Sequence, residues 1–450
     1  MNILFFDFET TKAPLHLPWI PGSFAVSLEM HSTSYGDSTF IINHKDHIPE
    51  SIYELKRKIQ EQVDRADLIV AFNLKFDLHW LRKMGIDFSK VRFYDPMIAE
   101  YILSGQTMFG AFLSMDSVAA KYGVEQKLAM VKQWWDNGYE TDEIPLDILI
   151  PYGKQDIVVL KSVYYKQQAV LKQQLTDGLI IPQRKLIALR CESLRVSEDI
   201  EWNGMLIDTE LTQGYSDSYG ATYTQLDTDL NLLIRKTLAM PNDVMLNLGS
   251  GDHLSAVLFG GVIKYEFVEN VIKTRKVKDL EIVTKTLKSG VVKKYQRVVM
   301  VPEQYEGTRK SIGLFETKGF QFKPGKGTET AKEGYWQTNK DQMFSLPRNT
   351  QDQKDLLAGT AQLSNIKKMK GTYFDGLLNK QIEGLVHPSV NETITKTGRY
   401  SSSEPNLQNV PRGTTSPIKE CFISRYEKDP ALDNKKADTI IIHDFIEEAA

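Results

Sequence analysis

The residues best suited to chemistry in this 450-residue chain are carboxylates that interrupt apolar segments. The chain begins MNILFFDFETTKAP, in which Asp7 and Glu9 break an apolar run. Side chains two positions apart lie on the same side of a β-strand, so both carboxylates are expected on one side, with Phe6 and Phe8 facing the core on the other. An exposed strand edge and a metal site both fit this spacing, and a second Asp-x-Glu later in the chain is assigned to an ordinary turn.

Two further polar pairs follow in the same part of the chain. In AFNLKFDLHWL, Asn73 and Asp77 lie where a buried strand is expected to end and a helix to begin, a place where an acid also serves as a plain N-cap. In PYGKQDIVVL, Tyr152 and Asp156 are four residues apart and share one face of a helix, on which Asp156 is either functional or a solvated charge. The ordered set Asp-x-Glu, Asn-x-x-x-Asp and Tyr-x-x-x-Asp is more specific than any of its parts.

These oxygen ligands suit the hydrolysis of a phosphodiester. The reaction needs a nucleophilic water and a neutralised leaving oxygen, and two divalent ions about 4 Å apart provide both. Carboxylates favour Mg²⁺ or Mn²⁺, whereas a zinc site is expected to include His or Cys. The hydroxyl of Tyr152, one helical turn before the last acid, can orient the attacking water by a hydrogen bond.

An α/β domain is predicted to position these residues. From Met1 to about Lys185, strands alternate with helices, a pattern typical of one sheet covered by helices. The expected strands are NILFFDF, SFAVSLEMH, STFIINH and DLIVAFN, and the expected helices include IYELKRKIQEQVDRA, FDLHWLRKMG and VVLKSVYYKQQAVLKQQL. The sheet is therefore expected to carry the first acids and its helices the later ones.

The second half of the chain has a different pattern. Residues 186–260 are predicted to be mostly helical, and a small β-rich insert is expected at about 261–335, with a hairpin turn at Lys-Ser-Gly. Residues 261–330 hold 15 Lys or Arg against 8 Asp or Glu, a local charge of +7 in a chain of net charge −3. Helices are expected again up to about residue 386, followed by a polar, turn-rich stretch.

Composition limits the class of protein. With 41% hydrophobic and 10% aromatic residues, the chain is expected to be globular and long enough for two or three domains. Its two cysteines exclude a disulfide framework and a cysteine-bound zinc site. Because the N-terminus has no basic leader region and no eighteen apolar residues run together, we expect a cytoplasmic protein, in the host cytoplasm if viral, with no membrane association.

The four acids and the tyrosine together resemble the 3′-to-5′ exonucleases of the Asp-Glu-Asp-Asp group, in the subclass that carries a tyrosine. The resemblance implies a ribonuclease-H-like fold and two-metal hydrolysis of the 3′-terminal nucleotide of single-stranded DNA. It also implies that Tyr152 orients the water and that Asn73 contacts the terminal nucleotide. The implied metal ligands are Asp7, Glu9, Asp77 and Asp156.

The stretch HPSVNETITKTGRYSSSEPNLQNVPRG, residues 387–413, is on composition alone a polar surface loop. Its Arg399, Asn406 and Gln408 could instead donate to the minor-groove acceptors that every base pair offers, which would test pair geometry. The stretch closely resembles the segment that precedes the first catalytic motif of family-A DNA polymerases. NLGSGDHLSAVLFGG, YWQTNKDQM and EWNGMLIDTE resemble thumb segments of that family, so the resemblance covers nearly the whole chain and favours the bacteriophage type.

The end of the chain matches the family less completely. In TIIIHDF, Asp444 and Phe445 match the first two positions of the first palm motif, which makes Asp444 a candidate palm metal ligand. The match is lost after Phe445, so we expect a reading frame broken inside the motif by an intron, an intein or a split gene. A naturally divergent short tail is the alternative. Polymerisation would then need a missing C-terminal part, supplied as a separate fragment.

The resemblance therefore implies the first part of a replicative family-A polymerase, with a proofreading exonuclease and a primer-template site. The expected domains are an exonuclease at 1–185, a thumb at 186–386 and the start of an α+β palm at 387–450. The basic insert would meet duplex backbone or a processivity factor, or is a solvated lysine-rich hairpin. The alternatives are a free-standing exonuclease whose second half only binds DNA, and an inactive DNA-binding fragment.

Overall fold

The described residues form two compact units, Met1–Thr212 with Gly376–Ala450, and Gln213–Asp375. The computed structural model describes the chain except for residues 12–22, 31–32, 43, 47–50, 125–129, 179–182, 287–291, 414–415 and 426–450. The candidate palm ligand Asp444 therefore lies outside the described residues.

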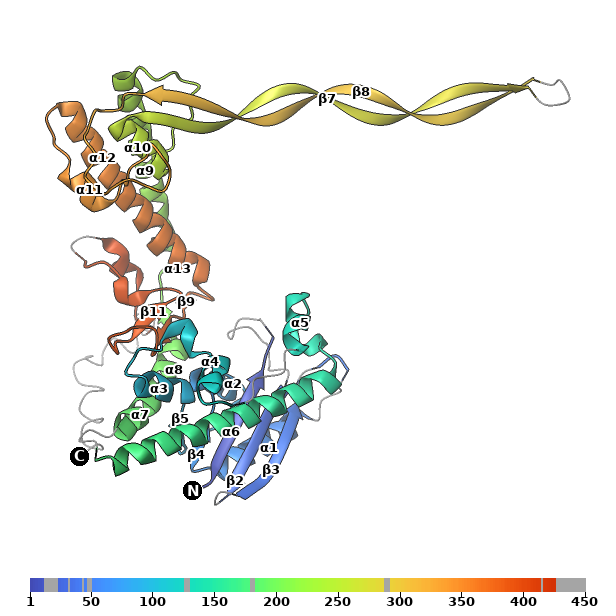
Figure 1. The fold of residues 1–450 in the computed structure, drawn as a ribbon, viewed down its shortest axis with the longest axis vertical. Coiled ribbons are helices and arrows are strands. Elements are labelled where there is room, and N and C mark those ends of the chain that lie inside the picture. Colours follow the sequence, from blue (N-terminus) through green and yellow to red (C-terminus); the bar gives the residue numbers. More distant parts are fainter. Residues whose placement is uncertain are drawn as a thin grey trace. The chain divides into compact units, whose positions relative to one another are not determined.

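The first unit is built on a five-stranded sheet with the order β3-β2-β1-β4-β5 (Figure 1). The first three strands pair antiparallel, whereas β4 and β5 are parallel to β1. The four predicted strands are confirmed, and the short β5 was not predicted. The strands are β1 Ile3–Glu9, β2 Ser23–Met30, β3 Thr33–Ile41, β4 Leu68–Val70 and β5 Arg92–Tyr94.

The central strand β1 is buried on both faces as far as Phe6. Phe6 and Phe8 face the core as predicted, but Phe5, on the carboxylate side, is also fully buried. Its ring meets that of Tyr164 at 5.4 Å, on the long helix α6, Leu146–Thr176, which packs against β1, β2 and β3. The apolar run before Asp7 thus fixes β1 under α6, and the carboxylates begin where this apolar cover ends.

Helices and short strands complete the first unit. β6 pairs with β9, and β10 pairs with β11, so the segment after residue 376 folds against the helices that follow the sheet. The helices are α1 Ile52–Asp64, α2 Leu74–Lys83, α3 Pro96–Leu103, α4 Met115–Lys121, α5 Met130–Asp136, α7 Gln183–Glu192 and α8 Leu194–Asn203. The short strands are β6 Met205–Leu206, β9 Leu385–Val386, β10 Ser389–Asn391 and β11 Ser401–Ser403.

The second unit is a helical body from which a two-stranded ribbon extends (Figure 1). The ribbon joins β7, Gly261–Thr286, to β8, Val292–Thr317, in one uninterrupted antiparallel register. It corresponds to the predicted β-rich insert but is much longer than the small protrusion expected, because alternation continues over 26 residues in each strand. The predicted turn falls outside the described residues. The helices are α9 Thr209–Leu238, α10 Gly251–Phe259, α11 Lys340–Ser345 and α12 Gln351–Lys368. The next helix, α13 Asp375–Lys380, belongs to the first unit from Gly376 onward.

Among the helices that the structure describes, none combines the length and apolarity of a bilayer-spanning segment.

Candidate active site

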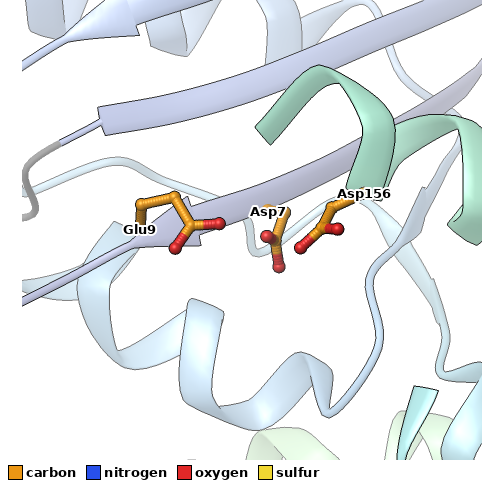
Figure 2. A group of neighbouring side chains, drawn as sticks. All are labelled: Asp7, Glu9 and Asp156. Atoms are coloured by element: carbon orange, nitrogen blue, oxygen red, sulfur yellow. The ribbon is translucent and has the colours of Figure 1, made fainter. Parts of the chain in front are cut away.

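Three of the predicted acids come together at the end of β1. Carboxylate oxygens of Asp7, Glu9 and Asp156 all lie within 4.8 Å of one another (Figure 2). Glu9 and Asp156 are buried and Asp7 is partly buried. Three clustered carboxylates repel one another, and a hard divalent cation with oxygen ligands relieves this repulsion. The donor set therefore fits a divalent metal site.

Helix α6 brings Tyr152 to the same place, one turn before Asp156. Its side chain is 7% exposed, and its ring lies edge-on to Trp135 at 6.0 Å. Burial raises the pKa of Tyr152 well above its usual range, and the nearby charges of Asp156, Glu9 and Asp7 raise it further. The hydroxyl therefore stays protonated and can act as a hydrogen-bond donor beside the carboxylates.

The fourth predicted acid, Asp77 of α2, is not part of the three-carboxylate group but lies directly beside it. Its Oδ1 accepts a hydrogen bond from the backbone N–H of Phe8, the residue between the two acids of β1, at 3.1 Å. Burial, and then the charge of Asp7, raises the pKa of Asp77 well above its usual value. A neighbouring cation would favour the ionised form of this buried carboxyl group and so lower its pKa.

Asn73 is held at the start of α2 by an aspartate that sequence reasoning missed. Asn73 has φ 60° and ψ 46°, the left-handed region that non-glycine residues rarely adopt. The buried carboxylate of Asp95 accepts from the backbone N–H groups of Asn73 at 3.1 Å, Leu74 at 3.0 Å and Met97 at 2.8 Å. Burial raises the pKa of Asp95 to about 7, against these hydrogen bonds, which lower it. The Asp-Pro pair after VRFY is an N-cap signal that could have identified it.

A cleft of about 640 Å³ opens beside Asn73 within the first unit. Phe76 of α2 lines it and is 43% exposed, and the opposite wall comes from the segment after β9. The cleft therefore lies between the start of α2 and the first residues of the polar stretch 387–413. Its lining includes Phe72, Asn73, Phe76, His79, Glu201, His387, Asn391 and Glu392.

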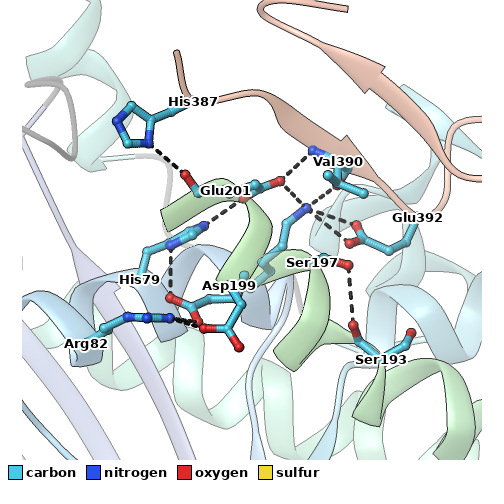
Figure 3. A network of polar contacts seen from close by, with 11 residues as sticks. His79, Arg82, Ser193, Ser197, Asp199, Glu201, His387, Val390 and Glu392 are labelled. Atoms are coloured by element: carbon cyan, nitrogen blue, oxygen red, sulfur yellow. Dashed lines mark hydrogen bonds and ion pairs between the residues drawn. The ribbon is translucent and has the colours of Figure 1, made fainter. Parts of the chain in front are cut away.

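One wall of the cleft is fixed by a buried network of charges (Figure 3). Lys75 Nζ lies 2.7 Å from Glu201 and 3.1 Å from Glu392, so α2 is tied to α8 and to the end of β10. His79 Nε2 contacts the same Glu201 at 2.7 Å, and Arg82 pairs with Glu198 at 2.8 Å. Because α2 also carries Asp77, this network sets where that acid lies relative to β10.

The three DNA-contacting residues predicted in the polar stretch 387–413 are in the same unit but are not among the described residues that line this cleft. Arg399, Asn406 and Gln408 are all exposed. The Asn406 side chain caps the short 3-10 helix Leu407–Asn409 by accepting from the backbone N–H of Asn409 at 3.2 Å. The side-chain oxygen is thus used within the chain, and the NH₂ group is the donor that a minor-groove contact would require.

Two family models match the chain. A 3′-5′ exonuclease model matches residues 23–172, and a DNA polymerase family A model matches residues 307–436. The first range includes Asp77, Tyr152 and Asp156, whereas Asp7 and Glu9 precede it and join them only through the fold. The second range includes the exposed residues of the polar stretch.

Similarities to two DNA polymerases agree with the two models. The DNA polymerase of Bacillus phage SP01 is 24% identical over 397 residues, 84% of this chain and 38% of the relative. DNA polymerase I of Mycobacterium leprae is 36% identical over 115 residues, 25% of this chain and 12% of the relative. This chain thus spans less than two fifths of either relative.

A solved structure has the same fold over most of the chain. The POL domain of Pol1 from M. smegmatis, in complex with DNA primer-template and dNTP, aligns with a TM-score of 0.59 at 15% identity, covering 94% of this chain and 55% of that one. Fold, family models and phage relative point in one direction. The chain is similar to DNA polymerases of family A, with a match to that family's model over residues 307–436 and to a 3′-5′ exonuclease model over residues 23–172.

Proposed function

We propose that this chain removes nucleotides from the 3′ end of DNA and binds primer-template DNA, as the proofreading part of a replicative polymerase. The observation that carries the proposal is the group formed by Asp7, Glu9 and Asp156, with Tyr152 beside it. An exonuclease domain implies dependence on a divalent metal, and an all-carboxylate donor set favours Mg²⁺ or Mn²⁺.

Each site residue has a proposed role. The three grouped carboxylates and the adjacent Asp77 would hold two metal ions, which when bound activate water and neutralise the leaving oxygen. The protonated hydroxyl of Tyr152 orients the attacking water by donating to it. Asn73, fixed by Asp95 at the edge of the cleft, contacts the terminal nucleotide.

The domain assignment is part of the proposal. Residues 1–185 form a ribonuclease-H-like exonuclease, 186–386 a thumb with the insert, and 387–450 the start of a palm. The strand order β3-β2-β1-β4-β5, antiparallel at one side and parallel at the other, supports the first assignment. The solved relative was bound to primer-template, which supports a DNA-contacting role for Arg399, Asn406 and Gln408.

Degradation of a 3′-labelled single strand tests the exonuclease. We expect Mg²⁺-dependent release of single nucleotides, with Asp7→Ala and Glu9→Ala each lowering the rate at least about a hundredfold, as loss of groups that hold a metal does. Asp147→Asn is the matched control, because it removes an exposed carboxylate from the same helix as Asp156. Equal rates for the three variants would refute the assignment.

Binding of a fluorescent primer-template tests the second part. Removing one side chain that reaches base edges costs about 1–3 kcal/mol, so Arg399→Ala and Gln408→Ala should each weaken duplex binding about tenfold. Binding of a single strand of the same length is the control and should change little. If the variants weaken binding of the duplex and of the single strand equally, these residues do not read base-pair geometry.

A further inference from the structure

The β7–β8 ribbon has two distinct faces. Its register runs from Gly261 opposite Thr317 to Thr286 opposite Val292 without a shift. Every even-numbered residue is therefore opposite another even-numbered one, and side chains alternate between faces along each strand. The even-numbered side chains make one face, the even face, and the odd-numbered ones make the other, the odd face.

The odd face carries three opposite-charge pairs across the strands, although Lys285 lies opposite Lys293 near its outer end. Three arginine–glutamate pairs lie directly opposite each other in the register, six residues apart along β7, with N–O distances of 2.6–2.8 Å. Such opposite-charge pairs stabilise antiparallel strands. The pairs are Glu269–Arg309, Arg275–Glu303 and Glu281–Arg297.

The even face is instead apolar and exposed. Among its described side chains, seven large apolar ones are 53–71% exposed, whereas the exposed aromatics of the odd face, Phe267 and Tyr305, are only 37% and 39% exposed. A two-stranded ribbon gains little stability by itself, and a row of exposed apolar side chains marks an interaction surface. The seven are Val268, Ile272, Ile282, Val298, Met300, Ile312 and Leu314.

The outer half of the even face also carries charge of one sign. Lys276, Lys278 and Lys294 are exposed there, and no even position from 274 to 304 is Asp or Glu. The carboxylates of this face, Glu266 among them, belong to the half nearer the helical body. A binding partner complementary to the outer half must therefore combine apolar groups with negative charge.

We propose that the even face of the ribbon docks an acidic protein, through an apolar strip flanked by carboxylates. Phosphates of nucleic acid would pair with the lysines. Because phosphates stay hydrated, they would not remove the apolar surface of Ile282, Val298 and Met300 from water, so these side chains would add no binding free energy. A symmetric contact between the outer halves of two copies would set lysine against lysine. This inference does not rest on the exonuclease assignment, since the ribbon belongs to the other compact unit.

Peptide binding to the purified full chain tests the proposal. The probe is a fluorescent amphipathic helix made of Leu and Glu, and its control is the matching helix of Leu and Lys. We expect the Leu–Glu peptide to bind at least about tenfold more tightly by fluorescence anisotropy. Ile282→Thr with Met300→Thr on the even face should weaken it about tenfold again, while Thr keeps the strand preference.

A matched variant on the odd face separates docking from folding. Val277→Thr with Val301→Thr changes two directly opposed residues of that face and should alter binding less than about twofold. Equal binding of the two peptides, no binding of either, or equal effects of the two double variants would overturn the proposal. The proposal would also be overturned if the even-face variant, but not the odd-face variant, lost affinity for duplex DNA. The same holds if the even-face variant alone lost a dimer detected by light scattering.

Discussion

At the scale of single residues, Asp95 connects the candidate site to the rest of the sheet. Its carboxylate accepts three backbone N–H groups, two at the start of α2 and one at the start of α3. It thereby holds Asn73 in a left-handed conformation that costs free energy by itself. Asp95 touches neither proposed substrate nor metal, so we regard it as a positioning residue.

Changing Asp95 tests that role. Asp95→Ala leaves three N–H donors, one buried and two partly buried, without their acceptor, so we expect it to lower the free energy of unfolding by about 2–4 kcal/mol. Asp95→Asn keeps one acceptor oxygen, so its free energy of unfolding should be higher than that of Asp95→Ala. In the Asp95→Asn variant we expect the KM for single-stranded DNA to rise more than kcat falls. The reason is that Asn73 moves, whereas the carboxylates of Asp7, Glu9 and Asp156 keep their positions. An unchanged KM would contradict the assignment.

At the scale of elements, Glu201 joins three segments. It contacts Lys75 and His79 of α2, and its side chain accepts from the backbone N–H of Val390 in β10. Burial by itself raises the pKa of Glu201, but the hydrogen bond from His79 and the charge of Lys75 outweigh it and hold the pKa below the usual value. The ionised form is therefore the one that the fold stabilises.

The stabilisation from Glu201 should depend on pH. A lowered pKa contributes stability above the ordinary value of 4.5, and this contribution is lost as the pH falls through the folded-state pKa. Chemical denaturation of Glu201→Gln should show a loss of about 3 kcal/mol at neutral pH that shrinks below pH 4.5. The control Asp199→Asn, 59% exposed on the same helix, should cost less than about 1 kcal/mol at every pH.

At the scale of the whole molecule, the candidate active site and the proposed docking surface lie in different compact units. Replacing residues 267–311 by an Asn-Gly turn would close the ribbon between Glu266 and Ile312, which are opposite each other. We expect the rate of single-strand degradation to stay within about twofold of the full chain, and binding of the Leu–Glu peptide to be lost. A large fall in the rate would show that the ribbon supports the exonuclease.

That this chain cannot add nucleotides by itself stays a prediction. Polymerisation needs metal-binding acids and a cationic group on the triphosphate, and the candidate Asp444 supplies at most one acid. With primed template, deoxynucleotides and Mg²⁺, we expect no extension by the purified chain while its exonuclease is active. Measurable extension would contradict this prediction.

The local sequence predicted the elements better than the contacts between them. The apolar pattern identified four of the five strands of the first unit's main sheet and the ribbon, because the two-residue period is a local property. Asp95 was missed because its role depends on backbone groups 21 and 22 residues earlier in the chain. The exposed face of the ribbon was also missed, since the sequence gives the alternation but not which side a core would cover.

What the sequence determined by itself was the set of residue types and their order: two acids on one strand, an Asn and an Asp around a helix start, and a Tyr one turn before the last Asp. Only the tertiary structure decided that three of these carboxylates meet within 4.8 Å, with Asp77 against the strand beside them. The physical reason is that burial of Phe5 under α6 fixes the distance between β1 and that helix. Spacing along the chain holds no information about that distance.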